Sequence, residues 1–137
     1  MRVLLSVRPA TDDDRSWIQG LGYISDPAAF VAHHGLERVG FAVYSLDGDH
    51  CRLLATHSRL PGLSVPTSLL SAVTAQARSN GCTRLWQTLT NDNIEGLRFY
   101  QARGWDLAAL HRNTHPGDQK GRDAIPIRHE LELEVLL

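Results

Sequence analysis

The chain has 137 residues, of which 42% are hydrophobic and 21% are charged, and its formal net charge is −1. This composition is typical of a folded protein, and the length predicts a single domain over residues 1–137. The balanced charge argues against a nucleic-acid partner bound through a strong positive field. No apolar run approaches the ~20 residues that a membrane-spanning helix needs, so no membrane partner is expected.

The N-terminal part of the chain predicts strands and one capped helix. Residues 4–8 form a strand candidate, and Thr11 followed by three aspartates is typical of a helix start. Residues 29–32, 38–46 and 50–58 are then predicted to form three strands of an antiparallel meander.

The C-terminal part alternates between helical and extended patterns. It predicts helices at 67–79 and 92–102, strands at 83–88, 105–110 and 125–135, and a polar loop at 113–123. In the last strand, Ile and Leu side chains alternate with Glu130, Glu132 and Glu134, which we expect to form a solvated face.

The two cysteines, Cys51 and Cys82, follow no metal-binding or disulfide-scaffold spacing. We therefore expect free, reduced thiols. The short apolar stretch after Met1 fits a first strand better than a signal peptide. A cytoplasmic location is the expectation that follows from both features.

The most informative stretch runs from Thr90 to Trp105. It places Asn93 early in a predicted helix, the Phe99-Tyr100 pair near the end of that helix, and a glycine and Trp105 at the start of a strand. Together with the order of the elements around it, this stretch resembles the GCN5-related N-acetyltransferases, the GNAT superfamily. The resemblance implies an α+β fold (an α/β three-layer arrangement), with a mixed, mostly antiparallel central sheet and helices on both faces.

The resemblance also implies a function, namely acetyl transfer from acetyl-CoA to an amine by direct attack, with no metal. Tyr100 would be the general acid that protonates the departing thiolate; its alternative is an aromatic that fills the core. Asn93 would lie beside the CoA chain; its alternative is a polar residue in the first helical turn. The residues implied to contact the cofactor are Ser58, Leu60, Gly62, Leu63, Ser64, Val65, Thr67, Asn93 and Phe99.

Residues 61–67 correspond to the family's pyrophosphate-binding loop and depart from its glycine-rich pattern. Leu63 stands where a basic residue is common, and Ser64 and Pro66 stand where glycine is preferred. Pro66 offers no N–H to a phosphate, and the Cβ of Ser64 restricts both close approach and positive φ. As a helix start, however, the same two residues are favourable. We therefore expect a degenerate loop that still begins a helix.

Four histidines, His57, His129, His33 and His34, are candidates for proton transfer or metal binding. The strand 50–58 carries no carboxylate, so His57 is the nearest candidate for a general base, or else a solvated strand-end residue. His129 is expected on the apolar face of the last strand, as a hydrogen-bonded core residue or a cleft-lining group. His33 and His34 should point to opposite faces of a strand, so no metal pair is expected.

The acceptor is not identified by the sequence, and it is either an amine-bearing small molecule or a protein. The segment 12–29, which in the family covers the amine site, is short and contains Gly20, Gly22 and Pro27. It predicts an open acceptor cleft, or one completed by a partner chain, and the apolar C-terminal end would suit a homodimer. Two functions remain open: an N-acetyltransferase, or a catalytically impaired GNAT-like protein that acts as a binding or scaffolding module.

Overall fold

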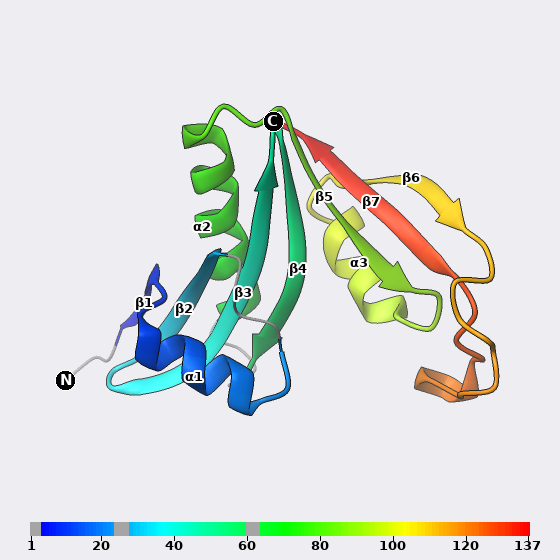
Figure 1. The fold of residues 1–137 in the computed structure, drawn as a ribbon, viewed down its shortest axis with the longest axis horizontal. Coiled ribbons are helices and arrows are strands. Elements are labelled where there is room, and N and C mark those ends of the chain that lie inside the picture. Colours follow the sequence, from blue (N-terminus) through cyan, green and yellow to red (C-terminus); the bar gives the residue numbers. More distant parts are fainter. Residues whose placement is uncertain (1–3, 24–27, 60–63) are drawn as a thin grey trace. The chain divides into compact units, whose positions relative to one another are not determined.

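The computed structural model of the protein describes residues 4–23, 28–59 and 64–137 (Figure 1). The chain packs as two compact units, residues 1–83 and residues 84–137. Within the described residues there are seven β-strands and three α-helices, and the strand pairs inside each unit are antiparallel. The predicted α+β class with mostly antiparallel pairing is confirmed, whereas the single domain over residues 1–137 stays a prediction.

The first unit contains the predicted meander. Its strands pair in the order β1-β2-β3-β4. They are β1 (Leu5–Pro9), β2 (Ala28–His34), β3 (Glu37–Asp47) and β4 (His50–Ser58). The ladder between β3 and β4 is shifted by one residue, because Val43 pairs with Ala55 and Tyr44 pairs with Leu53. Leu54 is thus the extra residue of a β-bulge in β4.

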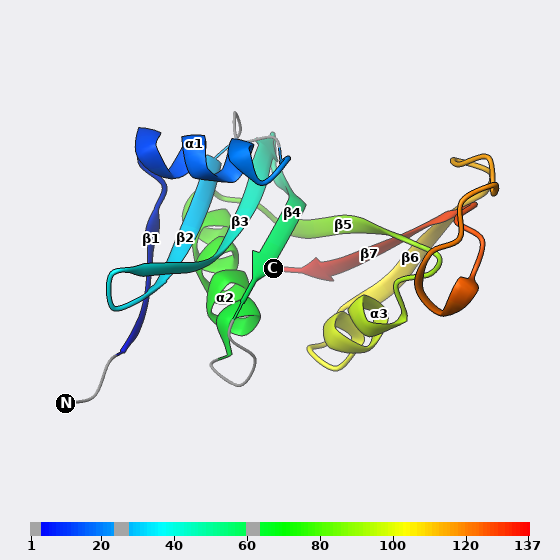
Figure 2. The ribbon, with the colours of Figure 1, turned by 90° about the horizontal axis from the view of Figure 1, so that it is seen from below.

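Helices α1 (Asp12–Gly20) and α2 (Val65–Ser79) lie on opposite faces of these strands (Figure 2). On the α1 face, Ile18 packs in a buried cluster with Phe41 and its neighbours. On the α2 face, Gly40 of β3 permits a close approach. A Cβ at Gly40 would lie 2.7 Å from Val65 Cγ1 and 2.7 Å from the carbonyl oxygen of His57. The absence of a side chain at Gly40 therefore lets the start of α2 rest directly on the sheet.

The start of α1 is fixed by a buried carboxylate. Asp14 is 0% exposed and forms a capping box with Thr11, whose N–H and hydroxyl donate to it at 2.7 and 2.9 Å. Arg38 Nε donates at 2.9 Å, and Arg8 pairs with the same carboxylate. Burial alone would raise the pKa of Asp14, but the bonds from Arg8, Thr11 and Arg38 hold the pKa well below its usual range. The carboxylate thereby ties α1 to β1 and β3.

The second unit has three strands in the order β5-β7-β6. Its elements are β5 (Arg84–Thr90), α3 (Ile94–Gln101), β6 (Asp106–His111), a short 3-10 helix (Arg122–Ala124) and β7 (Glu130–Leu136). Leu85 and Leu133 are 0% exposed, and Tyr100 and Trp105 are buried as well. All six residues of β6 are exposed.

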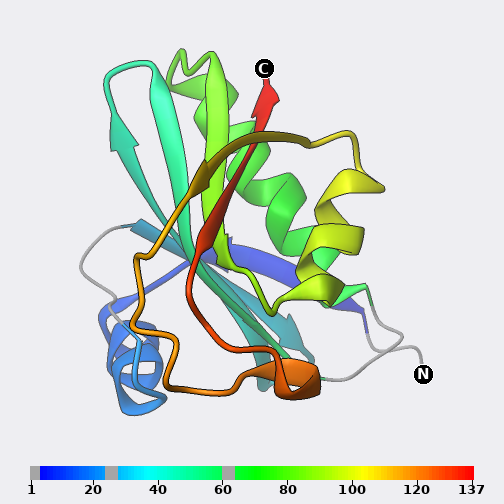
Figure 3. The same cartoon turned by 90° about the vertical axis from the view of Figure 1, so that its right-hand side faces the viewer.

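The last strand is shorter than predicted, because it begins at Glu130 and not at Ile125. The preceding residues are held instead by Asn91, whose Oδ1 accepts from the N–H groups of Arg128 and His129 at 2.8 and 2.9 Å. Its Nδ2 donates to the carbonyl of Pro126 at 2.9 Å. Since Pro126 also lacks an N–H, this stretch of the β6–β7 connection (Figure 3) leaves the ladder.

The glutamates of β7 correct a second expectation. Glu132 and Glu134 both pair with Arg84, whose Nε lies 2.9 Å from Glu134 Oε1, and Glu132 also pairs with His111 at 2.9 Å. The side chains of Arg84, Glu132 and Glu134 are only 16–25% exposed. Burial would raise the pKa of Glu132, but the bonds from His111 and Arg84 lower it. This face is therefore an ion-pair network between strands, and not a freely solvated row.

Both cysteines are free, as predicted, and the structure shows that both are buried. Burial, with a smaller contribution from Cys82, raises the pKa of Cys51 to about 12. At neutral pH Cys51 is therefore protonated and unreactive. In the part of the chain that the structure describes, no helix is both long and apolar enough to cross a membrane.

Candidate active site

His57, the predicted base, lies near the end of β4 and is half-buried among aromatic rings. It stands opposite Phe41 in the β3–β4 ladder, and the two rings stack at 5.4 Å between centroids. The ring of Tyr23 leans against it at 6.2 Å and meets Phe41 edge-on at 5.0 Å. His57 is therefore an oriented residue on the α1 face of the sheet, and not the freely solvated one of the alternative reading. Ser58 follows it and is exposed.

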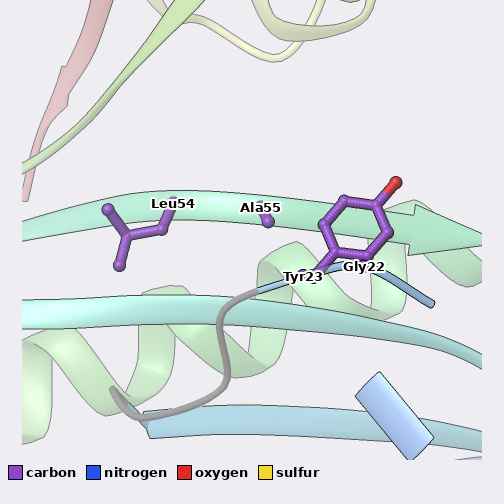
Figure 4. Close-up of a pocket in the computed structure, with 4 residues that line it drawn as sticks. All are labelled: Gly22, Tyr23, Leu54 and Ala55. Atoms are coloured by element: carbon purple, nitrogen blue, oxygen red, sulfur yellow. The ribbon is translucent and has the colours of Figure 1, made fainter. Parts of the chain in front are cut away.

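A cavity of about 310 Å³ opens on the first unit beside these rings (Figure 4). It is lined by Gly22 and Tyr23 from the segment after α1, and by Leu54 and Ala55 from β4. Leu54 is 41% exposed because it is the extra residue of the bulge, and Tyr23 is 37% exposed. No sequence pattern pointed to this cavity, because the bulge is visible only in the pairing of β3 with β4.

Helix α2 begins at Val65, two residues before the predicted start at residue 67. Ser64 is the N-cap residue, with φ +56° and ψ +33° in the left-handed region, and its side chain makes no capping hydrogen bond. Val65 is the first helical residue and is 0% exposed, so its side chain packs inward and only its backbone faces the helix start. Pro66 stands in the first turn, without an N–H. Ser64 therefore occupies the N-cap position that the sequence allowed, but without a capping hydrogen bond from its side chain.

Of the remaining cofactor candidates of the first unit, one lies among the described residues and three do not. Thr67, in the first turn of α2, is half-buried. Leu60, Gly62 and Leu63 lie outside the described residues, so the predicted degeneracy of the loop before Ser64 stays a prediction from sequence.

Asn93, in the second unit, is the N-cap of α3. Its side-chain oxygen accepts from the N–H of Gly96 at 2.9 Å. A Cβ at Gly96 would lie 2.8 Å from Asn93 Nδ2, so the glycine leaves room for this side chain. Asn93 therefore has a capping role in the helix start, and the amide nitrogen of its side chain is directed to the same turn.

Tyr100 lies in the last turn of α3 and is 6% exposed. Its ring packs against Phe99 and Trp105, each at 4.9 Å between centroids. Phe99 in turn lies under the guanidinium of Arg103, at 3.6 Å. The Phe-Tyr pair and the aromatic of the next strand thus form one cluster, which fixes the orientation of Tyr100.

Sequence reasoning missed a buried carboxylate at the start of the same helix. Asp92 is 2% exposed and accepts from Thr90 Oγ1 at 2.5 Å, and from the backbone N–H and the Nη1 of Arg122 at 3.0 and 3.1 Å. The bond from Thr90 lowers the pKa of Asp92 most; burial opposes this, and Arg122 lowers it further. A Cβ at Gly121 would lie 2.2 Å from Asp92 Oδ2. The Asp92–Gly121 contact joins the β6–β7 connection to the start of α3.

The other histidines take structural positions. His129 lies before β7, and its Nδ1 accepts from the N–H of Asn113 at 2.9 Å, so the expected place on the strand's apolar face is wrong. His33 Nε2 lies 2.8 Å from Arg8 Nη2, and burial, followed by the charge of Arg8, lowers its pKa. Among the described residues, no three His, Cys, Asp or Glu side chains are grouped so that they could hold a metal ion.

The elements and their order define the class of protein. The model of the acetyltransferase (GNAT) family matches residues 5–105. Two curated relatives are the uncharacterized proteins YdhI and YxbD of Bacillus subtilis (strain 168), which are 31% and 30% identical over 90 and 97 residues. These matches cover 66% and 71% of this chain, but only 56% and 61% of the two relatives.

Solved structures give the same fold. A GNAT family acetyltransferase from Elizabethkingia anophelis with acetyl-CoA bound is 16% identical in sequence and has a TM-score of 0.80. The match covers 97% of this chain and 98% of that chain. An acetyltransferase from Bacillus subtilis in complex with CoA is also 16% identical, with a TM-score of 0.79 and 99% of each chain covered. At this identity the likeness establishes the fold and no more. From the family match, the chain belongs to the acetyltransferase (GNAT) family.

Proposed function

We propose that the chain transfers the acetyl group of acetyl-CoA to an amine, with Tyr100 as the general acid and His57 as the base. The observation that carries the proposal is the build of α3. An asparagine caps its start, and an aromatic cluster orients a buried tyrosine in its last turn. That arrangement stands within the stretch of the chain on which the family resemblance depends.

The proposed reaction needs two proton transfers and no covalent enzyme intermediate. The amine nitrogen attacks the thioester carbonyl carbon, and His57 accepts the proton that the nitrogen loses. The tetrahedral adduct collapses as the C–S bond breaks, and the thiolate of CoA takes the hydroxyl proton of Tyr100. The products are the N-acetylated amine and CoA. Proton exchange with water then restores Tyr100 and His57.

The residues proposed to hold acetyl-CoA are Ser58, Ser64, Val65, Thr67, Asn93 and Phe99 in the described part of the chain. The structure limits what several of them offer. Val65 can contribute only its backbone N–H, because its side chain is fully buried. Ser64 already adopts the left-handed conformation that glycine usually provides, so its backbone reaches that shape despite its Cβ. These features support a helix start whose backbone N–H groups can bind an anion, although Pro66 contributes no N–H to it.

Tyr100→Phe tests the catalytic assignment. Loss of the hydroxyl should lower kcat by about 100-fold or more, while the affinity for acetyl-CoA changes little, because the ring and its packing are kept. The matched control is Tyr44→Phe, which removes the hydroxyl of another tyrosine that is 5% exposed. Unchanged turnover in Tyr100→Phe would remove Tyr100 from the proposed role.

A second candidate function is a binding or scaffolding module that has lost turnover. It is favoured by Pro66, which removes a first-turn donor from the helix start. Titration of acetyl-CoA, followed by thermal shift, separates the two. A ligand at 100 times its dissociation constant should add ~2.7 kcal/mol of stability. No stabilisation at millimolar acetyl-CoA would favour the module. Pro66→Ala, which restores the N–H, should then strengthen binding if this position is the defect.

We also propose a homodimer, as the C-terminal sequence predicted. Leu136 is 72% exposed at the end of β7, which supports an apolar contact there. Light scattering of the purified protein would show the mass of one chain or of two. A monomer at all concentrations would contradict this proposal.

A further inference from the structure

The cavity on the first unit carries an inference about the acceptor. We infer that the cavity between Tyr23 and Leu54 receives an apolar group of the acceptor, so that the preferred substrate is an apolar primary amine. This inference rests on the proposed acetyltransferase function and names the acceptor class for it. The cavity volume of about 310 Å³ is at the lower end of the range for small-molecule sites, and is large enough for one aromatic ring.

The lining favours an uncharged, apolar occupant. Of the four described lining residues, Tyr23, Leu54 and Ala55 present a ring, an isobutyl group and a methyl group, while Gly22 has no side chain and adopts φ +91°. Tyr23 and Leu54 are each more than a third exposed, so an apolar ligand would remove apolar surface from water. Figure 4 shows the ring of Tyr23 beside Ala55, with its hydroxyl directed away from Leu54.

The same lining disfavours a second charge on the acceptor. None of the described lining residues carries a carboxylate. The buried carboxylate of α1, Asp14, is already bonded to Arg8, Arg38 and Thr11. A diamine placed in the cavity would lose water from its second ammonium group, and the described lining residues offer no carboxylate to pair with it.

The position of the cavity relative to His57 makes an acceptor geometrically possible. Ala55 and His57 are two residues apart on β4, so their side chains share one face of the strand, ~6.8 Å apart along it. Tyr23 contacts both the cavity and His57, since its ring centroid is 6.2 Å from that of His57. An amine next to His57 can therefore reach the cavity through a linker of two or three carbon atoms. Phenethylamine has this shape.

The experiment measures binding before turnover. Isothermal titration calorimetry compares phenethylamine with 1,4-diaminobutane and ethanolamine on the unmodified protein, and then on Leu54→Asn. We expect phenethylamine to bind about tenfold or more tightly than the two polar amines, and Leu54→Asn to lose about tenfold for phenethylamine alone. The matched control is Leu46→Asn, because Leu46 is 42% exposed on β3 and does not line the cavity.

The outcomes separate the inference from the proposed function. Equal binding of the three amines, or equal effects of Leu54→Asn and Leu46→Asn, would overturn the inference even if acetylation is observed. Selective binding of phenethylamine without any acetyl transfer from acetyl-CoA would uphold the cavity and overturn the proposed enzyme. Selective binding together with a parallel ranking of kcat/KM would support both.

Discussion

The first unit contains two helix starts built in opposite ways. At α1, the side chains of Thr11 and Asp14 satisfy each other's backbone groups, and two arginines complete the coordination of the carboxylate. At α2, Ser64 sits in the left-handed region, its side chain makes no capping bond, and Pro66 brings no N–H. The first start uses its polar side chains for stability, whereas at the second the side chain of Ser64 makes no capping bond to the backbone.

The comparison shows that a helix start with capping side chains serves stability, whereas one without them is better suited to bind a ligand. A capping side chain occupies the donors that an anionic ligand would otherwise use. The start of α1 is therefore closed to ligands, and its loss should affect folding. We expect changes at the start of α2 to cost less stability than changes at the start of α1, and to affect ligand affinity more. The start of α3, where Asn93 both caps and is a proposed CoA contact, lies between these two cases.

The largest expected effect on stability concerns the start of α1. Asp14→Asn keeps the shape of the side chain but leaves Arg8 and Arg38 without their anion. The two arginine side chains are 40% and 32% exposed, so water can solvate them, and the main loss is that of charged hydrogen bonds to a buried carboxylate. We therefore expect a loss of stability of about 1.5–3 kcal/mol in urea unfolding. Asp12→Asn, on an exposed aspartate of the same turn, is the control and should change stability by less than about 0.5 kcal/mol.

Acid unfolding sharpens the same test. The pKa of Asp14 is lower in the folded protein than in the unfolded chain, where it is about 3.9. Its contribution to stability is therefore fully present above pH ~5 and is lost as the pH falls through and below the unfolded pKa. Asp14→Asn should flatten this part of the curve of unfolding free energy against pH. A curve with the original slope would mean that other carboxylates, such as Asp92, dominate acid unfolding.

The intermediate effect concerns α3. Asn93→Ala removes the side-chain acceptor of the Gly96 N–H and should destabilise the protein by about 1 kcal/mol. Asn93→Asp keeps the acceptor and should preserve stability. If acetyl-CoA affinity falls in the alanine variant alone, the capping geometry is what binding needs. If it falls in both, the amide group of Asn93 itself contacts the ligand.

The smallest expected effect concerns the start of α2, where the sign of the change in stability is the informative result. Ser64→Gly relieves a non-glycine residue at φ +56° and should stabilise the protein by about 0.5–1 kcal/mol. Ser79→Gly, the same substitution in the last turn of α2, should instead destabilise it by about 0.5 kcal/mol. Chemical denaturation of both variants gives the two signs. A destabilising Ser64→Gly would show that the Ser64 side chain has a stabilising role after all.

Local sequence signals predicted the elements that local chemistry determines. Thr11 and the aspartates gave the correct start of α1, and the pattern of 50–58 gave the correct bounds of β4. The last strand was misplaced because alternation alone continues through Ile125 and Pro126. Only the fold shows that Asn91, distant in sequence, takes the backbone groups of that stretch. The pairing of Arg84 with Glu132 and Glu134 could not be predicted either, because these residues are distant in sequence and meet only through the pairing of β5 with β7.

By itself, the sequence determined the family and the residue types at the candidate positions, because the spacing of Asn93, Tyr100 and Trp105 is a local property of one helix and the strand after it. Only the tertiary structure decided how His57 is surrounded, that the side chain of Val65 is unavailable to a ligand, and that Leu54 bulges into a cavity. Each of these depends on the register between β3 and β4 or on the closeness of α2 to Gly40. Such contacts join residues far apart in the chain, and no local pattern of side chains encodes them.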